Sequence, residues 1–467
     1  MNNFILELNS KGNQPLYQQL YSFLVQEIQA GNLKENEKLP SKRELSAYLK
    51  ISLNTIDTAY QMLVDEGYVR SMPRSGFYVC KYEILSFADR PIIQKKEKAK
   101  DDFSFRYDFS AHTVDTEAFP YATWSKITKE VMYQNPQLLS KGHPQGDVCL
   151  REALGKYLHE FRGIHCTPEQ IIIGAGIEYL LGLITEILGE HSVYAVENPG
   201  YMKAFRIIKN NGRKIHCISM DENGILTDEL KRSDSNVAYI TPSHQYPTGT
   251  VMPIGRRLEI LRWANAQAGR YIIEDDYDSE FRFNGRPIPS LQSMDDMGKV
   301  IYIGTFSRSI APSIRIAYMV LPDELLNRYQ EDFNFYSSTV SRFEQHTLYR
   351  FIHDGHFGRH INRMRNVYRK RKDTLVSAFK ESAMSKDFHV IGENAGLHFL
   401  LQVDNGRTEQ DLITLAAIAG VKVTGLSQYC LKPVENLPRS TIVLGYAGFP
   451  PEDMKTAAAL LCNVWQK

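Results

Sequence analysis

The sequence predicts two folded domains of different class: a small, mostly helical module with a β-hairpin over residues 1–80, and a large α/β domain over residues 106–467. Two patterns lead to this division. Short capped helices fill the first segment, whereas apolar strands alternate with longer helices in the second. The length of 467 residues agrees with it, because single cores rarely grow beyond about 250–300 residues.

Composition limits the class of protein. Hydrophobic residues make up 43% and charged residues 23% of the chain, as in soluble globular proteins. The six cysteines show neither a C-x-x-C pair nor the spacing of a zinc site, so we expect reduced thiols and no metal. The amino terminus lacks a secretory signal, and no apolar run is long enough to span a membrane. We therefore expect a cytoplasmic protein without a membrane segment.

Three helices are predicted in the first segment. Pro15 opens the first, whose apolar residues recur at helical spacing until Gly31 stops it. The second starts at the capping box Ser41-Lys-Arg-Glu44. Ser52 caps the third, which Gly67 ends. Each helix turns one apolar face inward.

A β-hairpin follows the helices. The stretches Tyr68-Val-Arg70 and Gly76-Phe-Tyr-Val79 alternate around the turn Pro73-Arg-Ser-Gly76. Three short helices and a hairpin in so short a segment are the pattern of a winged helix-turn-helix, whose third helix enters the major groove of DNA. The segment therefore predicts a DNA-binding domain.

The placement of polar residues supports DNA binding, although net charge does not. Residues 1–80 hold eight Lys or Arg and eight Asp or Glu. Lys42 and Arg43 lie at the start of the second helix, and Arg74 lies near the hairpin tip. Lys42 and Arg43 could instead only solvate a helix start, where the helix dipole slightly disfavours a cation. The third helix adds short polar side chains that can reach phosphates and base edges, namely Ser52, Asn54, Thr55 and Thr58.

This segment resembles the GntR family of bacterial regulators. The matching motifs are Pro15-Leu-Tyr-Gln-Gln19, Leu39-Pro-Ser-Lys-Arg-Glu-Leu45, Asn54-Thr-Ile-Asp-Thr-Ala-Tyr60, Leu63-Val-Asp-Glu-Gly67 and Gly76-Phe-Tyr-Val79. The resemblance implies double-stranded operator DNA as a partner, contacts from Arg43 and the start of the third helix, and a wing tip formed by Gly76. One departure is Leu53, where the family usually carries arginine. Leu53 could instead touch a thymine methyl group.

Residues 81–105 break the periodicity. Gln94-Lys-Lys-Glu-Lys-Ala-Lys100 is a charged, mostly basic run without an apolar face. It is typical of a solvated linker. The alternative is that its lysines add phosphate contacts beside the DNA-binding module.

The second segment alternates apolar strands with amphipathic helices, two of them at 177–188 and 256–268. This alternation predicts a largely parallel sheet, whose ligand lies at the carboxyl ends of the strands. Strands are predicted at 171–173, 193–196, 238–241, 271–273, 300–303 and 316–321.

Polar motifs follow three of these strands. Gly174-Ala-Gly-Ile-Glu178 opens a helix whose free N–H groups favour a phosphate, although such turns also use glycine for steric reasons. Tyr201 offers an aromatic face for stacking, or is an ordinary half-buried tyrosine. Residues 274–280 include five acids, which would repel one another unless a cation lay among them. If it is buried, a carboxylate such as Asp275 would keep the nitrogen of a bound pyridine ring protonated.

The turn between the last two predicted strands carries two hydroxyls and two cations, a set suited to a phosphate. The alternative is a loop of solvated charges. The four residues are Thr305, Ser307, Arg308 and Arg315.

This turn resembles the cofactor-lysine loop of fold-type I aminotransferases, with Arg308 at the place of the lysine. The large domain as a whole resembles that of MocR/GabR-type regulators, and together with the first segment the resemblance covers nearly the whole chain. Further matching motifs are Tyr107-Asp-Phe-Ser110, Phe119-Pro120, His143-Pro-Gln-Gly146, Leu150-Arg151, Thr241-Pro-Ser-His-Gln-Tyr-Pro-Thr-Gly249 and Glu274-Asp-Asp-Tyr-Asp278.

The resemblance implies a fold-type I α/β domain that binds pyridoxal phosphate. It also implies a head-to-tail homodimer, in which each DNA-binding module leans on the large domain of the other subunit. By resemblance, Gly176, Ile177, Thr305 and Arg315 would hold the phosphate with help from Ser307, Tyr201 would stack on the ring, Asp275 would pair with the pyridinium nitrogen and Tyr277 would meet the phenolic oxygen.

Two departures shape the functional expectation. A guanidinium stays protonated and is not a nucleophile, so Arg308 predicts no internal aldimine, no transamination and no catalytic residue. Arg308 could pair with the phosphate or with an effector carboxylate, and whether it is native or introduced is open. In the strand Ile442–Ala447, Val443 stands where aminotransferase-like proteins commonly carry an arginine for the substrate carboxylate, unless Arg439 takes that role.

We therefore expect a DNA-binding transcription regulator that senses pyridoxal phosphate, an amino-acid or amine effector, or both. The cofactor would bind non-covalently or as an adduct, unless the pocket has moved to another ligand. One alternative is an aminotransferase with an accessory DNA-binding module. Another is an architectural DNA-binding protein whose large domain is inert.

Overall fold

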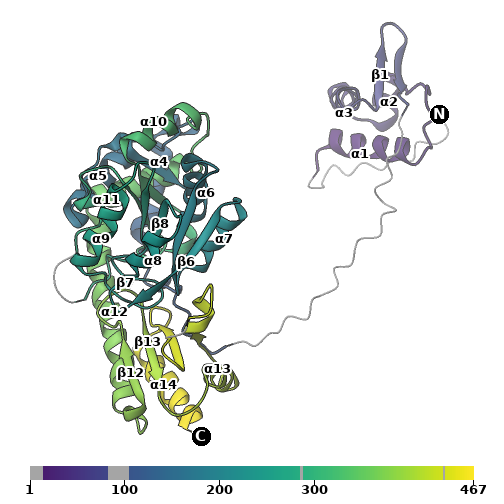
Figure 1. Ribbon diagram of the computed structural model, residues 1–467. Helices are drawn as coiled ribbons and strands as arrows, with labels where there is room; N and C mark the ends of the chain where they lie inside the picture. The colour runs from purple at the N-terminus through teal and green to yellow at the C-terminus, as the bar shows by residue number, and fades with distance from the viewer. Residues whose placement is uncertain (1–13, 82–104, 284–287, 435–436, 467) are drawn as a thin grey trace. The chain divides into compact units, whose positions relative to one another are not determined.

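The computed structural model describes residues 14–81, 105–283, 288–434 and 437–466. The chain forms two compact units, Met1–Asp101 and Asp102–Lys467, and each is described by itself (Figure 1). The basic run 94–100 of the predicted linker lies outside the described residues. None of the helices in the described part of the chain is both long and apolar enough to cross a membrane.

The small unit has the three predicted helices and the predicted hairpin. Ser41 and Glu44 form the capping box of the second helix, and the Ser52 side chain accepts a hydrogen bond from the backbone N–H of Thr55 in the third. The apolar faces meet in one core that includes Leu24, Tyr60 and both strands. The elements are α1 (Leu16–Gln29), α2 (Lys42–Leu49), α3 (Leu53–Asp65), β1 (Val69–Met72) and β2 (Gly76–Val79).

The hairpin differs from the prediction at its tip. The strands β1 and β2 are antiparallel, and Met72 pairs with Gly76. The turn residues are therefore 73–75, and Gly76 is the first residue of β2 rather than the wing tip. Its φ of +122° is a conformation that favours glycine. Arg74, at φ +61°, is the exposed cation of the turn.

An eight-stranded sheet forms the centre of the large unit. All six predicted strands are present, with ends shifted by up to three residues. Neighbouring strands from β10 to β6 are parallel, whereas β11 is antiparallel to both of its neighbours, so the sheet is mixed. Its order is β4 (Ile171–Gly174), β11 (Ala317–Val320), β10 (Val300–Thr305), β9 (Tyr271–Asp276), β8 (Val237–Ile240), β5 (Val193–Asn198), β6 (Lys214–Asp221) and β7 (Gly224–Ile225).

Helices cover both faces of this sheet, which explains the continuous apolar runs of its strands. In β10, Ile301 and Ile303 pack in a core shared with α6 and α10. Val300 points the other way and packs with α8 and α9. The helices of this part of the unit are α6 (Ile177–Leu188), α7 (Met202–Asn210), α8 (Thr227–Arg232), α9 (Ile254–Asn265) and α10 (Asp323–Asp332).

A second, four-stranded antiparallel sheet lies in the C-terminal part, at one end of the large unit (Figure 1). The sequence indicated only its strand β16, within the apolar stretch Ile442–Ala447. The short strand β3 (Tyr107–Asp108) pairs in parallel with β14 (Val421–Lys422), which brings the start of the unit to its C-terminal part. The remaining elements are α4 (Tyr121–Gln134), α5 (Val148–Arg162), α11 (Arg342–His353), α12 (His356–Lys380), β12 (Phe388–Ile391), β13 (His398–Val403), α13 (Glu409–Ile418), β15 (Thr424–Gly425), β16 (Thr441–Gly445) and α14 (Pro451–Gln466).

Candidate ligand pocket and DNA-binding surface

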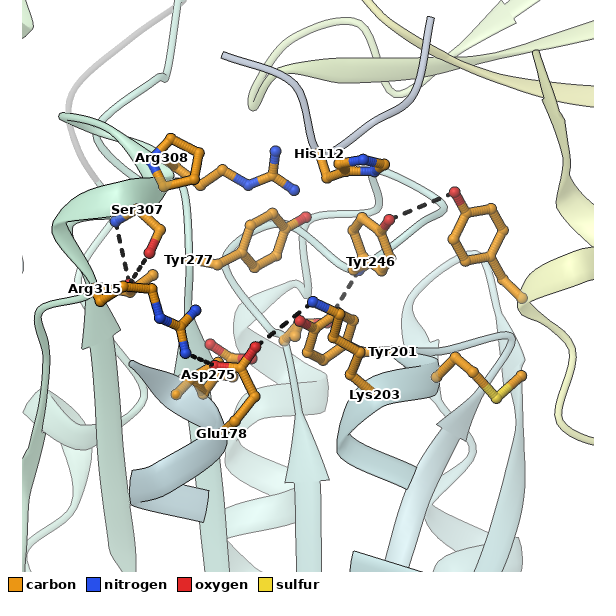
Figure 2. Close-up of a pocket in the computed structure, with 16 residues that line it drawn as sticks. His112, Glu178, Tyr201, Lys203, Tyr246, Asp275, Tyr277, Ser307, Arg308 and Arg315 are labelled. Carbon is orange, nitrogen blue, oxygen red and sulfur yellow. Dashed lines mark hydrogen bonds and ion pairs between the residues drawn. The ribbon is translucent and has the colours of Figure 1, made fainter. Parts of the chain in front are cut away.

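A cavity of about 440 Å³ opens at the carboxyl ends of the parallel strands, beside the start of α6 (Figure 2). Gly176 adjoins it as the N-cap of α6, where a Cβ would lie 2.5 Å from Nη2 of Arg315. The other residues predicted to bind the cofactor all line the cavity, namely Ile177, Tyr201, Asp275, Tyr277, Thr305, Ser307, Arg308 and Arg315. The fold thus brings together side chains from four separate segments.

One end of the cavity gathers groups that suit an anion. Gly176, at φ +89°, gives α6 no side-chain cap, so the first N–H groups of the helix have no capping oxygen from that residue. The Thr305 hydroxyl donates to Oγ of Ser307 at 3.1 Å and accepts the Ser307 backbone N–H at 3.2 Å. Arg315 follows a short 3-10 turn and places its guanidinium at the same end. This end fits a phosphate.

Glu178 occupies part of the same end with its own carboxylate. Its Oε2 accepts a hydrogen bond from Nη2 of Arg315 at 2.7 Å, and its Oε1 lies 3.6 Å from Nζ of Lys203. Partial burial acts to raise the pKa of Glu178, but the hydrogen bonds to its carboxylate and the charges of Arg315 and Lys203 together lower it. The Arg315 cation therefore has an anionic partner within the chain.

Asp275 forms a buried part of the cavity wall. Its Oδ2 accepts a hydrogen bond from the Tyr239 hydroxyl, and its Oδ1 is buried without a hydrogen-bond partner among the described residues. Burial raises the pKa of Asp275 to about 7, and the neighbouring Asp276 acts in the same direction. A buried carboxylate with one unsatisfied oxygen is suited to a cationic N–H donor such as a pyridinium.

Two aromatic side chains of the cavity, Tyr201 and Tyr277, are held in place by neighbouring side chains. Tyr201 and Tyr277 each meet the ring of Tyr246 edge to face, at 5.6 and 5.7 Å between centroids. The Tyr277 hydroxyl lies 2.9 Å from Nδ1 of His244, which also lies 3.0 Å from Oδ2 of Asp278. Tyr277 is thereby fixed at the cavity wall.

His244 and Asp278 also belong to a buried group with metal-ligand atoms. Together with His398 they place one such atom each within 4.8 Å of the others. Nδ1 of His244 and Oδ2 of Asp278 are already hydrogen-bonded to each other, and Nε2 of His398 bonds the Pro247 carbonyl at 3.0 Å. We interpret the group as a hydrogen-bonded support for Tyr277.

A cation lies among the acids of 274–280, as their repulsion predicted, and it belongs to the chain itself. Asp276 forms a buried ion pair with Arg162 at 2.7 Å. Glu274 accepts the backbone N–H groups of residues 291 and 292, and Glu280 accepts the Tyr157 hydroxyl. The sequence did not reveal this because Arg162 lies on a distant helix. Asp275 is the acid of this stretch that lines the cavity.

Arg308 lines the cavity on the other side of Tyr277 from Asp275 (Figure 2). Its Nη1 is buried and has no hydrogen-bond partner among the described residues. The pKa of neighbouring His112 is lowered, first by burial and then by the charge of Arg308. Arg308 thus lines the cavity and carries a buried donor that has no partner in the described part of the chain.

Sequence reasoning missed half of the cavity lining. Glu178, Thr241 and Tyr246 lie inside motifs that were recognised without a role being given to these residues. His112 and Tyr429 gave no sequence signal, because the β3–β14 pairing and the C-terminal part bring them in from far along the chain. The missed residues are His112, Glu178, Met202, Lys203, Thr241, Tyr246, Pro312 and Tyr429.

The structure separates the two candidates for a substrate-carboxylate position. Val443 is fully buried in β16 and packs in a cluster with Tyr246, beside Tyr201 and Tyr277. Arg439 is exposed in the turn before β16 and does not line the cavity. The position close to the cavity is therefore apolar.

Most of the residues predicted to bind DNA are exposed on the small unit. Arg43, Ser52, Asn54 and Thr58 are exposed, and Leu53 among them is 46% exposed. Several of their groups already have partners. Lys42 forms an ion pair with Asp57, Ser52 and Thr55 share a 2.8 Å hydrogen bond, and the Thr58 hydroxyl donates to the Asn54 carbonyl. Arg43 is the most available cation of the set.

Two protein families match the chain in succession. The gntR family of bacterial regulatory proteins matches residues 16–79, and the aminotransferase class I and II family matches residues 110–461. The kynurenine aminotransferase of Pyrococcus horikoshii superposes with a TM-score of 0.67 at 23% identity, over 78% of this chain and 91% of that chain. An archaeal alanine:glyoxylate aminotransferase gives a TM-score of 0.69 at 22% identity, over 77% and 90% of the two chains. These structures establish the fold of the large unit.

Relatives at higher identity span both units. The uncharacterized HTH-type transcriptional regulator YdeL of Bacillus subtilis is 40% identical over 98% of each chain. The probable rhizopine catabolism regulatory protein MocR of Rhizobium meliloti is 31% identical over 97% of this chain and 94% of MocR. The HTH-type pyridoxine biosynthesis transcriptional regulator PdxR of Corynebacterium glutamicum is 31% identical over 86% of each chain.

The order of the two family matches and the names of the full-length relatives indicate the same type of protein, a transcriptional regulator with two domains. The aminotransferase family also implies binding of pyridoxal phosphate. The chain belongs to the MocR-type family of HTH-type transcriptional regulators, in which a GntR-type module precedes a domain of aminotransferase class I and II.

Proposed function

We propose that this chain binds operator DNA through its small unit and binds pyridoxal phosphate in the large unit without a covalent bond to residue 308. The observation that supports this proposal is a pocket whose lining includes groups suited to each part of the cofactor, together with Arg308. By the resemblance of its loop, Arg308 stands at the place of the cofactor lysine. An amino-acid or amine effector, a head-to-tail homodimer and the domain limits 1–80 and 106–467 belong to the same proposal.

The pocket residues fit the cofactor part by part. Gly176, Ile177, Thr305, Ser307 and Arg315 would hold the phosphate at the start of α6. Tyr201 would stack on the ring, Tyr277 would face the phenolic oxygen, and the unsatisfied Oδ1 of Asp275 would accept the pyridinium N–H. When bound, the cofactor supplies an electron-withdrawing ring and an aldehyde. The residues of this chain bind and orient it.

Arg308 favours sensing over catalysis. A guanidinium remains protonated and does not attack an aldehyde. Lys203 is a lysine that does line the pocket, but its ammonium is paired with the Glu178 carboxylate at 3.6 Å. We therefore propose a regulator that does not catalyse transamination.

Borohydride trapping tests this proposal. The full chain is incubated with pyridoxal phosphate in a buffer free of amines, reduced, digested and mapped by mass spectrometry. We expect a ligand-dependent rise in melting temperature but no reduced adduct at any pocket residue. Arg308→Lys is the matched control, in which we expect an adduct at position 308.

Three results would contradict the proposal. An adduct on the wild-type chain, including one at Lys203, would overturn non-covalent binding. Absence of any thermal shift would overturn cofactor binding. Transamination by the wild-type chain that disappears in Asp275→Ala would instead support an aminotransferase with an accessory DNA-binding module.

A further inference from the structure

We infer that Arg308 makes the pocket choose among pyridoxal-phosphate-like molecules by the group on ring carbon 4, accepting an oxygen substituent and rejecting an ammonium. This inference rests on the proposed function and deepens it, because it names which chemical form of the ligand the pocket selects. No bond forms or breaks in this recognition.

The covalent geometry of the ligand sets the orientation. Carbon 4 of the pyridine ring is directly opposite the ring nitrogen. Figure 2 shows Asp275 on one side of Tyr277 and Arg308 on the other. A ring whose nitrogen meets Asp275 therefore directs its carbon-4 substituent toward Arg308. The phosphate arm, on the neighbouring carbon, can then reach the end of the pocket formed by Ser307 and Arg315.

The charge balance around Arg308 favours an acceptor at that place. Its Nη1 is a buried donor without a partner among the described residues, and such a group is costly until an acceptor arrives. Glu178 lines the pocket as well, but its carboxylate is bound to Arg315 and Lys203. Burial and then the charge of Arg308 lower the pKa of neighbouring His112, and an imidazole supplies no negative charge in either protonation state. A ligand oxygen would satisfy the Arg308 donor.

The three common phosphorylated forms differ only in this group. Pyridoxine phosphate has an alcohol and pyridoxal phosphate an aldehyde, and both oxygens accept a hydrogen bond. Pyridoxamine phosphate has an ammonium at neutral pH, which has no lone pair to offer and is repelled by a guanidinium. The amine form is the one that a transamination cycle would require. Arg308 would therefore remove both the nucleophile and the affinity for the amine form.

Calorimetric titration of the full chain tests the inference with pyridoxine 5′-phosphate and pyridoxamine 5′-phosphate. The buffer contains neither phosphate, which would compete at the start of α6, nor primary amines. We expect the amine form to bind the wild-type chain at least about tenfold more weakly than the alcohol form. Arg308→Gln, which removes the charge, should bring the two affinities within about threefold of each other.

Two further variants assign the effect. Lys203→Gln should leave the affinity ratio unchanged, because Glu178 already compensates the Lys203 charge. Arg308→Lys keeps a cation and should keep the discrimination, and neither ligand has an aldehyde that could react with the new amine. Arg308→Lys also keeps the inference testable if Arg308→Gln does not fold.

The outcomes separate this inference from the proposed function. Equal or tighter binding of the amine form by the wild-type chain would overturn the inference and leave cofactor binding intact. A ratio that is lost in Lys203→Gln and kept in Arg308→Gln would overturn the assignment to Arg308. Failure of these two ligands and of pyridoxal phosphate to bind would overturn the proposed function as well.

Discussion

The N-termini of α3 and α6 are the helix starts on which each unit's predicted function depends, and they are built differently. At α3, the Ser52 side chain accepts the Thr55 N–H at 3.1 Å, so the turn is closed within the chain. At α6, Gly176 provides no side-chain cap, and the Arg315 guanidinium packs where a Cβ would otherwise stand. A capped start can present side chains to a macromolecule, whereas an uncapped start leaves its own N–H groups for a small anion.

The same contrast holds for charge. Arg43 of the small unit is exposed to solvent, where its charge has no desolvation cost and is available to DNA. The large unit buries Asp275 and the Nη1 atom of Arg308 with unsatisfied hydrogen-bonding capacity. Groups of the second kind are costly without a ligand. The four predictions below test whether the two regions have separate ligands, from the largest expected effect to the smallest.

Asp275→Asn should have the largest effect. The amide keeps the shape of the side chain but loses the charge that pairs with a pyridinium, so affinity for pyridoxine phosphate should fall by about 2–5 kcal/mol. Calorimetric titration measures the loss. DNA affinity in the absence of ligand should stay at the wild-type value. Unchanged ligand affinity would remove Asp275 from the binding site.

The pH dependence of stability should change in the same variant. Asp275 has a folded pKa of about 7, well above the value of about 3.9 of an unfolded aspartate. The folded state therefore holds a proton that the unfolded state has lost, and the ligand-free chain loses stability through this group as pH rises from about 4 to about 7. The melting temperature of Asp275→Asn minus that of the wild type should rise over this window and then level. A difference that is constant with pH would contradict burial of the carboxylate.

Arg43→Ala should weaken DNA binding by about 1–3 kcal/mol if Arg43 contacts a base edge. The operator is first selected from a random duplex library with the full chain, and affinity is then measured by fluorescence anisotropy at fixed salt. Lys42→Ala is the matched control. Because Lys42 already pairs with Asp57, its loss should weaken binding less. The reverse order of the two variants would contradict the assignment of Arg43.

Ser52→Ala should have the smallest effect, a loss of about 1 kcal/mol in the stability of the small unit. Its cause is the missing cap of the Thr55 N–H. Amide hydrogen exchange in the first turn of α3 reports this loss, and exchange in α6 should not change. Equal exchange of the α3 amides in both proteins would show that Ser52 does not hold this turn.

Local patterns were sufficient to predict much of this molecule. Capping residues such as Ser41 and Ser52 gave the helices of the small unit, and continuous apolar runs gave the strands of the sheet. The convergence of Gly176, Asp275 and Arg315 could also be predicted, because parallel strands end at one edge of a sheet.

Long-range partners could not be predicted in the same way. Arg162 forms an ion pair with Asp276, which lies 114 positions later in the sequence. No local sequence pattern predicts such a pair. Tyr429 reaches the pocket from the short 3-10 helix Leu426–Tyr429, which follows the two-residue strand β15, and elements this short have no clear periodicity. The wing was predicted, but its tip was misplaced by one residue, since the register of a hairpin depends on the conformation of its turn.

The most direct test of the central claim is the affinity of the full chain for its selected operator, measured with and without saturating pyridoxal phosphate at one salt concentration. Allosteric coupling free energies are typically about 1–3 kcal/mol, so we expect the affinity to change by about fivefold or more in one direction. Asp275→Asn should show no such change at the same ligand concentration. An operator affinity that is identical with and without the ligand, while calorimetry shows the wild-type pocket to be filled, would contradict the account and favour a DNA-binding protein with an inert large unit.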